Sequence, residues 1–168
     1  MQSKNIARNE DPVKYAVDPS PATASEDEII AMALGILFKR MRTGECLNSP
    51  SLVSDYLKLR LDGLEHEVFG VVFFDAQNRV IQAEELFRGT LTQTSVYPRE
   101  VVKEALKLNA ASAIFYHNHP SGVATPSNAD RHITEALKNA LSMVDVKSLD
   151  HIIVAGGTSV SFAERGYM

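Results

Sequence analysis

The chain has 168 residues, of which 45% are hydrophobic and 23% charged, as is typical of one globular domain with some extra length. Its 17 Lys and Arg residues against 21 Asp and Glu residues give a net charge of −4, which argues against direct nucleic-acid binding without excluding it. The single cysteine, Cys46, excludes an intramolecular disulfide, and no apolar run has the length of a membrane span or the layout of a signal peptide. We therefore expect a cytoplasmic protein that does not engage the membrane.

The amino-terminal part is predicted to contain a tail and two helices. Residues 1–24 mix polar, charged and Pro residues without apolar periodicity, which predicts a flexible tail. Ser25 and Glu28 have the spacing of a capping box, so we assign residues 25–46 to an amino-terminal helical segment whose helix ends near residues 42–44. A shorter helix is expected from about residue 50 to residue 61.

Residues 47–168 are predicted to form the main domain. The expected elements are strands at 67–74 and 79–86, a helix at 98–110, a strand at 112–117, a helix at 128–144, and a hairpin of strands at 146–155 and 158–163. The first strand is apolar along nearly its whole length, which indicates that both of its faces are covered. This order of elements predicts an α/β (α+β) fold, with helices flanking a mixed β-sheet.

Two histidines at the end of a predicted strand suggest a metal site. Strand side chains alternate between faces, so His117 and His119 place both imidazoles on one face, and neutral imidazoles suit a divalent metal. Asp130, in the first turn of the following helix, could be the third ligand. Three protein ligands leave a fourth position for water, which is the arrangement of a catalytic zinc site.

Two further residues are candidates for catalysis. Glu67 begins an otherwise apolar strand and is the candidate general base, although the sequence alone does not place it beside His117. Ser127, three residues before Asp130, could direct its hydroxyl at the oxyanion that forms during attack on a carbonyl. A serine at this spacing from an acid also caps many helices, and the two roles are compatible.

Together these residues resemble a known motif. Glu67, His117-x-His119-Pro120 and Ser127-x-x-Asp130 are similar to the motif of the JAMM (MPN-plus) metalloproteases. The strings HNHPSG at 117–122, FRGT at 87–90 and YPRE at 97–100 resemble the RadC branch of that family. The resemblance implies a cytidine-deaminase-like architecture, hydrolysis of a peptide or isopeptide bond, and a historical DNA-repair label. Larger RadC proteins carry a helix-hairpin-helix module, so this chain is expected to be a short form without one.

Each candidate residue also has a simpler interpretation. Taken alone, His117-x-His119 is more often two histidines at a strand end than a metal site, and Glu67 could be a solvated residue where the strand enters the sheet. His66 and His132 are predicted to lie at the surface, whereas His151 either lines the pocket or, as we favour, packs in the interior. Cys46 has no activating neighbour and is expected to be a spectator thiol. The letters HNH do not indicate an HNH nuclease, whose named residues are spread through a larger unit.

The leading hypothesis is a zinc-dependent hydrolase with one Zn²⁺ per chain and a peptide or protein substrate. Zinc would polarise the carbonyl, Glu67 would move the proton from the bound water to the leaving amine, and Ser127 would steady the oxyanion. Other first-row ions also suit these ligands. Two alternatives stay open: a scaffold without turnover, and a nuclease or accessory factor in DNA repair. A homodimer is among the oligomeric states that the sequence leaves open.

Overall fold

The computed structural model describes residues 24–44, 51–89 and 95–168. The described chain runs through α1 (Glu26–Arg42), α2 (Ser51–Leu61), β1 (Val68–Phe74), β2 (Val80–Arg88), α3 (Pro98–Lys107), β3 (Ser112–Asn118), α4 (Asn128–Ser142), β4 (Lys147–Ala155) and β5 (Thr158–Ser161). The predicted α/β class is therefore confirmed. The expected tail, except for Ala24, and Cys46 lie outside the described residues.

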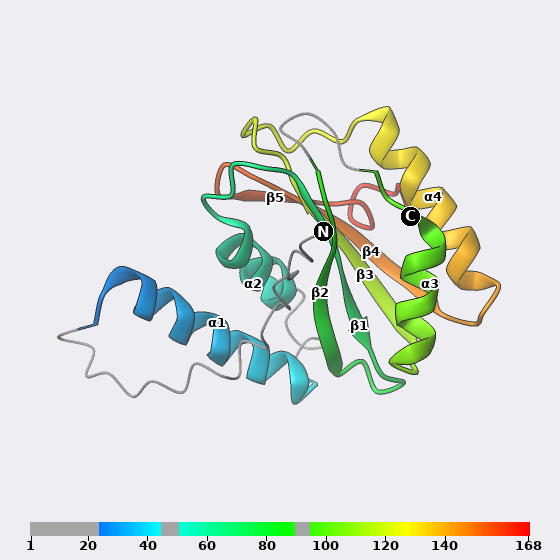
Figure 1. The fold of residues 1–168 in the computed structure, drawn as a ribbon, viewed down its shortest axis with the longest axis horizontal. Helices are drawn as coiled ribbons and strands as arrows, with labels where there is room; N and C mark the ends of the chain where they lie inside the picture. The colour runs from blue at the N-terminus through cyan, green and yellow to red at the C-terminus, as the bar shows by residue number, and fades with distance from the viewer. Residues whose placement is uncertain (1–23, 45–50, 90–94) are drawn as a thin grey trace, which may run out of the picture.

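The five strands form one mixed sheet in the order β2-β1-β3-β4-β5. Strands β3 and β4 are parallel, and the other neighbouring pairs are antiparallel. A parallel pair needs a crossover, which α4 provides between the end of β3 and the start of β4. Helices α3 and α4 cover one face of the sheet, and α1 and α2 lie on the other (Figure 1).

Strand β1 shows why its sequence is almost continuously apolar. All seven of its residues are buried. Phe69, Val71 and Phe73 pack toward α3 and α4, whereas Val72 and Phe74 pack toward α1 and α2. Because both faces are covered, the strand has no polar side to show, and each fully buried large side chain contributes about 1.5–3 kcal/mol relative to exposure.

Two helices end earlier than predicted. Helix α3 ends at Lys107 rather than near residue 110, and α4 ends at Ser142 rather than near residue 144. Shortly after each end, a non-glycine residue has left-handed backbone geometry: Asn109 has φ 50° and Asp145 has φ 59°. Neither position carries the glycine that usually marks such a helix end, so the sequence pattern placed the boundaries too late.

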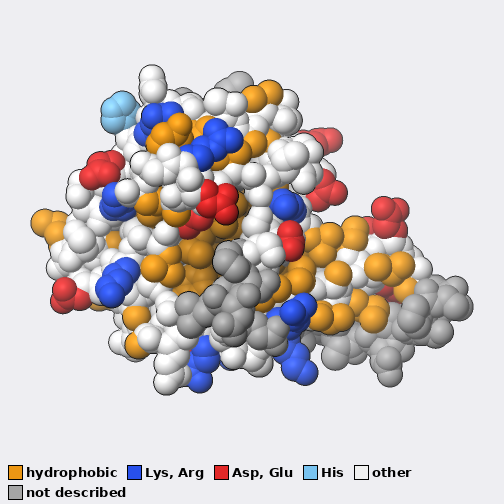
Figure 2. Space-filling model, turned by 180° about the vertical axis from the view of Figure 1, so that it is seen from behind, with side chains coloured by type: hydrophobic (Ala, Val, Ile, Leu, Met, Phe, Trp, Pro, Cys, Tyr) orange, Lys and Arg blue, Asp and Glu red, His pale blue; other side chains and the backbone are white. Residues whose placement is uncertain are grey.

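Helix α1 is apolar on more than one side. The predicted capping box between Ser25 and Glu28 is present, and Phe38 and Met41 are buried toward α2 and the sheet. On the outer side Ile29 is 51% exposed and Ile36 is 58% exposed. Apolar side chains are visible along this helix where it projects from the rest of the molecule (Figure 2). Among the described helices, none combines the length and apolar character needed to cross a bilayer.

Candidate metal centre

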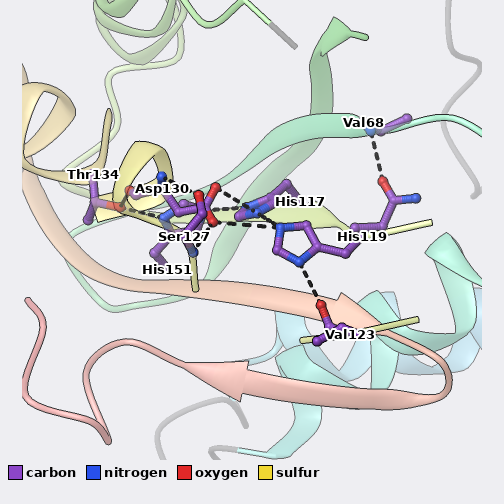
Figure 3. Close-up of polar contacts among 9 residues, drawn as sticks. Val68, His117, His119, Val123, Ser127, Asp130, Thr134 and His151 are labelled. Atoms are coloured by element: carbon purple, nitrogen blue, oxygen red, sulfur yellow. Dashed lines mark hydrogen bonds and ion pairs between the residues drawn. The ribbon is translucent and has the colours of Figure 1, made fainter. Parts of the chain in front are cut away.

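The three predicted ligands come from two neighbouring elements. His117 is the penultimate residue of β3, His119 follows that strand directly, and Asp130 lies in the first turn of α4. The backbone N–H of His119 still donates to the carbonyl of Val154 in β4, at 2.9 Å. A turn closed by the N–H of Gly122 donating to the His119 carbonyl, at 3.0 Å, then begins the loop that leads to α4. The three side chains meet above the end of the sheet (Figure 3).

The spacing of the ligand atoms fits a metal ion. Nε2 of His117 lies 2.9 Å from Nε2 of His119. Nε2 of His117 is 3.2 Å from Oδ1 of Asp130, and Nε2 of His119 is 3.6 Å from Oδ2. Four ligands placed tetrahedrally at about 2.0–2.1 Å from zinc are about 3.3 Å apart, which lies within this range of separations. His117, His119 and Asp130 can therefore hold one ion with little rearrangement.

The hydrogen bond of His119 leaves the correct nitrogen free. Nδ1 of His119 lies 2.8 Å from the carbonyl oxygen of Val123. A carbonyl only accepts, so Nδ1 carries the proton, and the neutral ring presents the lone pair of Nε2 to His117 and Asp130. This is the form in which imidazole binds a metal.

Ser127 and Asp130 form the predicted capping box of α4. The Asp130 backbone N–H donates to Oγ of Ser127 at 3.1 Å, and the Ser127 backbone N–H donates to Oδ2 of Asp130 at 2.7 Å. The cap therefore fixes the carboxylate that faces the two imidazoles. It uses Oγ of Ser127 as an acceptor, which leaves the hydroxyl proton available to another group.

The electrostatics favour a cation between the three side chains. Burial raises the pKa of Asp130, but the contacts with the His117 and His119 rings and the hydrogen bond from Ser127 outweigh burial and hold this pKa far below its usual range. The hydrogen bond with Asp130 raises the pKa of His119. Asp130 is thus a carboxylate at neutral pH. A proton or a metal ion between the three side chains can neutralise its charge and bind the lone pairs that point toward it.

Glu67 is brought to the same place by the sheet. The final β1–β3 pair is Phe69 opposite His117, so Glu67 and His119, each two residues beyond this pair, lie at the same end of the two strands. The charge of Glu67 also contributes to the raised pKa of His119, although it is the last of the causes. The long-range strand pairing therefore brings Glu67 to the end of the sheet where the ligands lie, which the sequence alone could not establish.

Asn118 fixes the backbone on both sides of Glu67. Its Oδ1 accepts from the Val68 N–H at 2.7 Å, and its Nδ2 donates to the His66 carbonyl at 3.0 Å. Asn118 is only 4% exposed; its contact with Val68 is buried and its contact with His66 is partly buried. The alternation of strand side chains puts Asn118 on the face opposite His117, but it does not reveal what this side chain binds.

His151 lies in the interior, as we favoured, but it also has polar partners. It is 0% exposed, and burial lowers its pKa well below the usual histidine value. Its Nε2 lies 2.8 Å from Nδ1 of His117, and its Nδ1 lies 2.6 Å from Oγ1 of Thr134. Sequence reasoning missed Thr134, although its position four residues after Asp130, on the same face of α4, was a usable signal.

The other two histidines were predicted to lie at the surface. His132 is exposed on α4 as predicted, whereas His66, before β1, is half-buried with its Nδ1 3.3 Å from Nη2 of Arg88. Neither belongs to the group of potential ligands found among the described residues.

A cavity adjoins the site on the His119 side. Its volume is about 460 Å³, and its walls are formed by residues 61–65 after α2, by residues around the end of β3, and by the turn at 154–157. Asp62 and Glu65 contribute carboxylates to the lining, and Leu61 and Val154 contribute apolar surface. The centre is therefore open to a molecule of moderate size.

Known proteins share these features. Residues 47–167 match the RadC-like JAB domain, and the mixed sheet with flanking helices is consistent with the JAB/MPN architecture. The chain belongs to the RadC-like JAB domain family.

Its relatives are bacterial proteins. A protein of Thiobacillus denitrificans is 57% identical over 140 residues, which cover 83% of this chain and 62% of that protein. One from Nitrosomonas eutropha is 56% identical over 82% of this chain and 62% of its own length. One from Vibrio cholerae is 53% identical over 86% of this chain and 91% of its own length. All three are named UPF0758 protein, which states no activity, and this chain spans about 62% of the first two.

Proposed function

We propose that this chain is a zinc-dependent hydrolase of the JAMM type that cleaves a peptide or isopeptide bond. The observation that carries the proposal is the convergence of two imidazole nitrogens and one carboxylate at separations of 2.9, 3.2 and 3.6 Å. The protein supplies three ligands, so the fourth position of a tetrahedral ion remains for water or substrate. Membership of the RadC-like JAB domain family and the adjoining cavity support the same proposal.

When bound, zinc would supply Lewis-acid activation of water and of the amide carbonyl. Glu67, at the same end of the sheet as His119, would accept the proton of the attacking water and deliver it to the leaving amine nitrogen. Ser127 can donate its remaining hydroxyl proton to the developing oxyanion, because its capping contact uses only an oxygen lone pair. Asn118 binds the backbone of the residues before and after Glu67, which restricts the position of this base relative to the ligands.

The test compares Glu67→Gln with wild type on a library of fluorogenic peptides and isopeptide-linked lysines, with zinc content measured for both proteins. Positioned acid–base groups contribute about 10²–10⁴-fold to rate. We therefore expect Glu67→Gln to lose at least about 100-fold in turnover while retaining its zinc. Glu135→Gln, an exposed glutamate on α4, is the matched control and should be as active as wild type.

Either of two results would count against the hydrolase. Turnover by Glu67→Gln as fast as that of wild type would remove the assigned base. Zinc-loaded wild type that cleaves none of the linkages in the library would favour a scaffold role.

A further inference from the structure

The environment of His151 is unusual for a buried polar ring. It lies in the middle of β4 among Phe69, Phe115 and Phe162, with ring centroids 5.5, 5.9 and 4.8 Å away. The Phe69 and Phe115 contacts are edge-on, at 71° and 90°. Burying a polar ring among aromatic side chains costs free energy unless both of its nitrogens have hydrogen-bond partners. Both do: His117 on one side and Thr134 on the other.

The hydrogen bonds around His151 form a series, and the direction of each can be deduced by starting from the Asp130 carbonyl. Oγ1 of Thr134 lies 2.5 Å from the backbone carbonyl oxygen of Asp130, which has no proton, so the Thr134 hydroxyl donates there. That hydroxyl has a single proton, so it can only accept from the second neighbour. Nδ1 of His151, 2.6 Å away, must therefore carry a proton and donate it to Thr134.

The same argument fixes the position of the proton on His117. A neutral His151 with its proton on Nδ1 has a lone pair on Nε2, and Nδ1 of His117 lies 2.8 Å from that lone pair. His117 must then carry its proton on Nδ1. Its Nε2 is left without a proton, and this is the atom that faces His119 and Asp130.

We propose that Thr134 and His151 are positioning residues that fix the tautomer and orientation of His117, so that its Nε2 lone pair is presented to the metal. The inference rests on the metal centre of the proposed function. It adds that the Asp130 carbonyl, Thr134, His151 and His117 form one buried chain of hydrogen bonds, which joins two of the three ligands through α4 and β4 (Figure 3).

This series of hydrogen bonds matters because a neutral imidazole can carry its proton on either nitrogen. A proton on Nε2 of His117 would point an N–H group at the ion and would have to be removed before binding. Fixing the proton on Nδ1 avoids that step and holds the ring plane. Loss of such an outer partner typically weakens metal affinity about 10–100-fold.

The experiment uses Thr134→Val, which keeps the side-chain shape but removes the hydroxyl, and Thr134→Ser as the matched control that keeps it. Long-range ¹H–¹⁵N spectra of the metal-free full chain, at a pH above the raised pKa of His119, report the tautomer of each ring. Wild type and Thr134→Ser should show His117 and His151 protonated on Nδ1. Thr134→Val should show a mixture at both rings.

Zinc affinity, measured by competition with a chelator, is the second readout. We expect Thr134→Val to bind zinc about 10–100-fold more weakly than wild type, with Thr134→Ser close to wild type. A purely structural role for Thr134 would lower thermal stability in Thr134→Val but leave zinc affinity unchanged, which would overturn the proposal. So would a wild-type His117 protonated on Nε2.

Failure of this inference is distinct from failure of the proposed function. The tautomer and affinity measurements need no substrate, so a chain with the expected tautomers and affinities but no hydrolysis contradicts only the hydrolase. Conversely, an active enzyme in which Thr134→Val matches Thr134→Ser in both readouts contradicts only the positioning role.

Discussion

The two faces of β3 bury polar side chains in opposite ways. On the face covered by α1 and α2, the Tyr116 hydroxyl donates to the Glu84 carbonyl at 3.0 Å, and burial raises the pKa of Tyr116. Nearby, Nη1 of Arg60 donates to the Tyr56 hydroxyl at 2.6 Å. On the opposite face the next residue, His117, directs an unprotonated nitrogen at another imidazole nitrogen and a carboxylate.

The comparison shows what distinguishes a structural polar cluster from a functional one. Around Tyr116 and Arg60, side-chain donors reach acceptors within the protein: the Tyr56 hydroxyl and the Ala83 and Glu84 carbonyls. Around His117 the ligand atoms are all acceptors in the neutral state, and only a cation can complete them. The candidate metal ligands therefore gather at the end of β3, on the face that α4 covers, and the predictions below test that asymmetry.

The largest effect is expected at the carboxylate ligand. Asp130→Asn keeps an oxygen that can accept the capping hydrogen bond from Ser127, but it removes the negative charge between the imidazoles. Zinc affinity should fall by more than the roughly 10–100-fold typical of an outer partner. Chelator competition measures the change, with Asp55→Asn on α2 as the exposed control. Equal affinity in Asp130→Asn and wild type would remove Asp130 from the ligand set.

On the face covered by α1 and α2, the strongest test is Gly70→Ala. A Cβ at Gly70 would overlap the ring and hydroxyl of Tyr116 and the backbone carbonyl of Glu84. Such overpacking typically costs about 1–3 kcal/mol in the free energy of unfolding. Urea denaturation of Gly70→Ala and of the control Gly35→Ala measures this. Gly35 lies inside α1 with open space around its Cβ position, so the control should gain about 0.5–1 kcal/mol. A Gly70→Ala chain as stable as wild type would contradict the assigned packing.

Asn118 connects the two faces, so its variant should separate stability from metal binding. Asn118→Ala leaves the buried N–H of Val68 and the carbonyl of His66 without this partner, which costs about 1–3 kcal/mol in stability. Because the strand that carries Glu67 is loosened while the ligands are intact, we expect turnover to fall with zinc affinity nearly unchanged. Steady-state kinetics together with chelator competition test this. A parallel loss of zinc affinity would show that Asn118 supports the ligands instead.

The smallest expected effect is a pH dependence of the metal-free protein. The folded-state pKa of His119 is raised by Asp130, so its contribution to stability is present below the unfolded histidine pKa and is lost as pH rises through the folded value. The pKa of Asp130 is lowered, so its contribution is present above the unfolded aspartate pKa and is lost as pH falls through the folded value. The contribution of the His119–Asp130 pair, measured as the stability of metal-free wild type minus that of Asp130→Asn, should therefore be largest between the unfolded pKa values of Asp and His.

Thermal melts with and without zinc across that window check the sign. Zinc competes with the proton on His119, so the stabilisation that zinc provides should increase with pH. The stability difference between metal-free wild type and Asp130→Asn should decline as pH rises through the folded pKa of His119. A difference that does not decline there would contradict the His119–Asp130 pairing.

Local pattern was sufficient for much of this fold and for the ligand set. The period of two in β3 put His117 and His119 on one face, and the Ser127 cap placed Asp130 in the first turn of α4. What depends on long-range pairing was not accessible. The β1–β3 register that brings Glu67 to the same end of the sheet as His119, and the approach of β4 and α4 that joins His151 to Thr134, link residues far apart in the chain. The ends of α3 and α4 were also missed, because Asn109 and Asp145 adopt a backbone geometry that residue type alone rarely reveals.

The central claim is that His117, His119 and Asp130 hold one metal ion. It is tested most directly by elemental analysis of the full chain, purified without added metal and then equilibrated with zinc, with His119→Ala measured in parallel. The account predicts about one zinc per chain in wild type and little in His119→Ala, with a folded variant confirmed by circular dichroism. No bound metal in wild type after zinc addition, or equal zinc in both proteins, would contradict it.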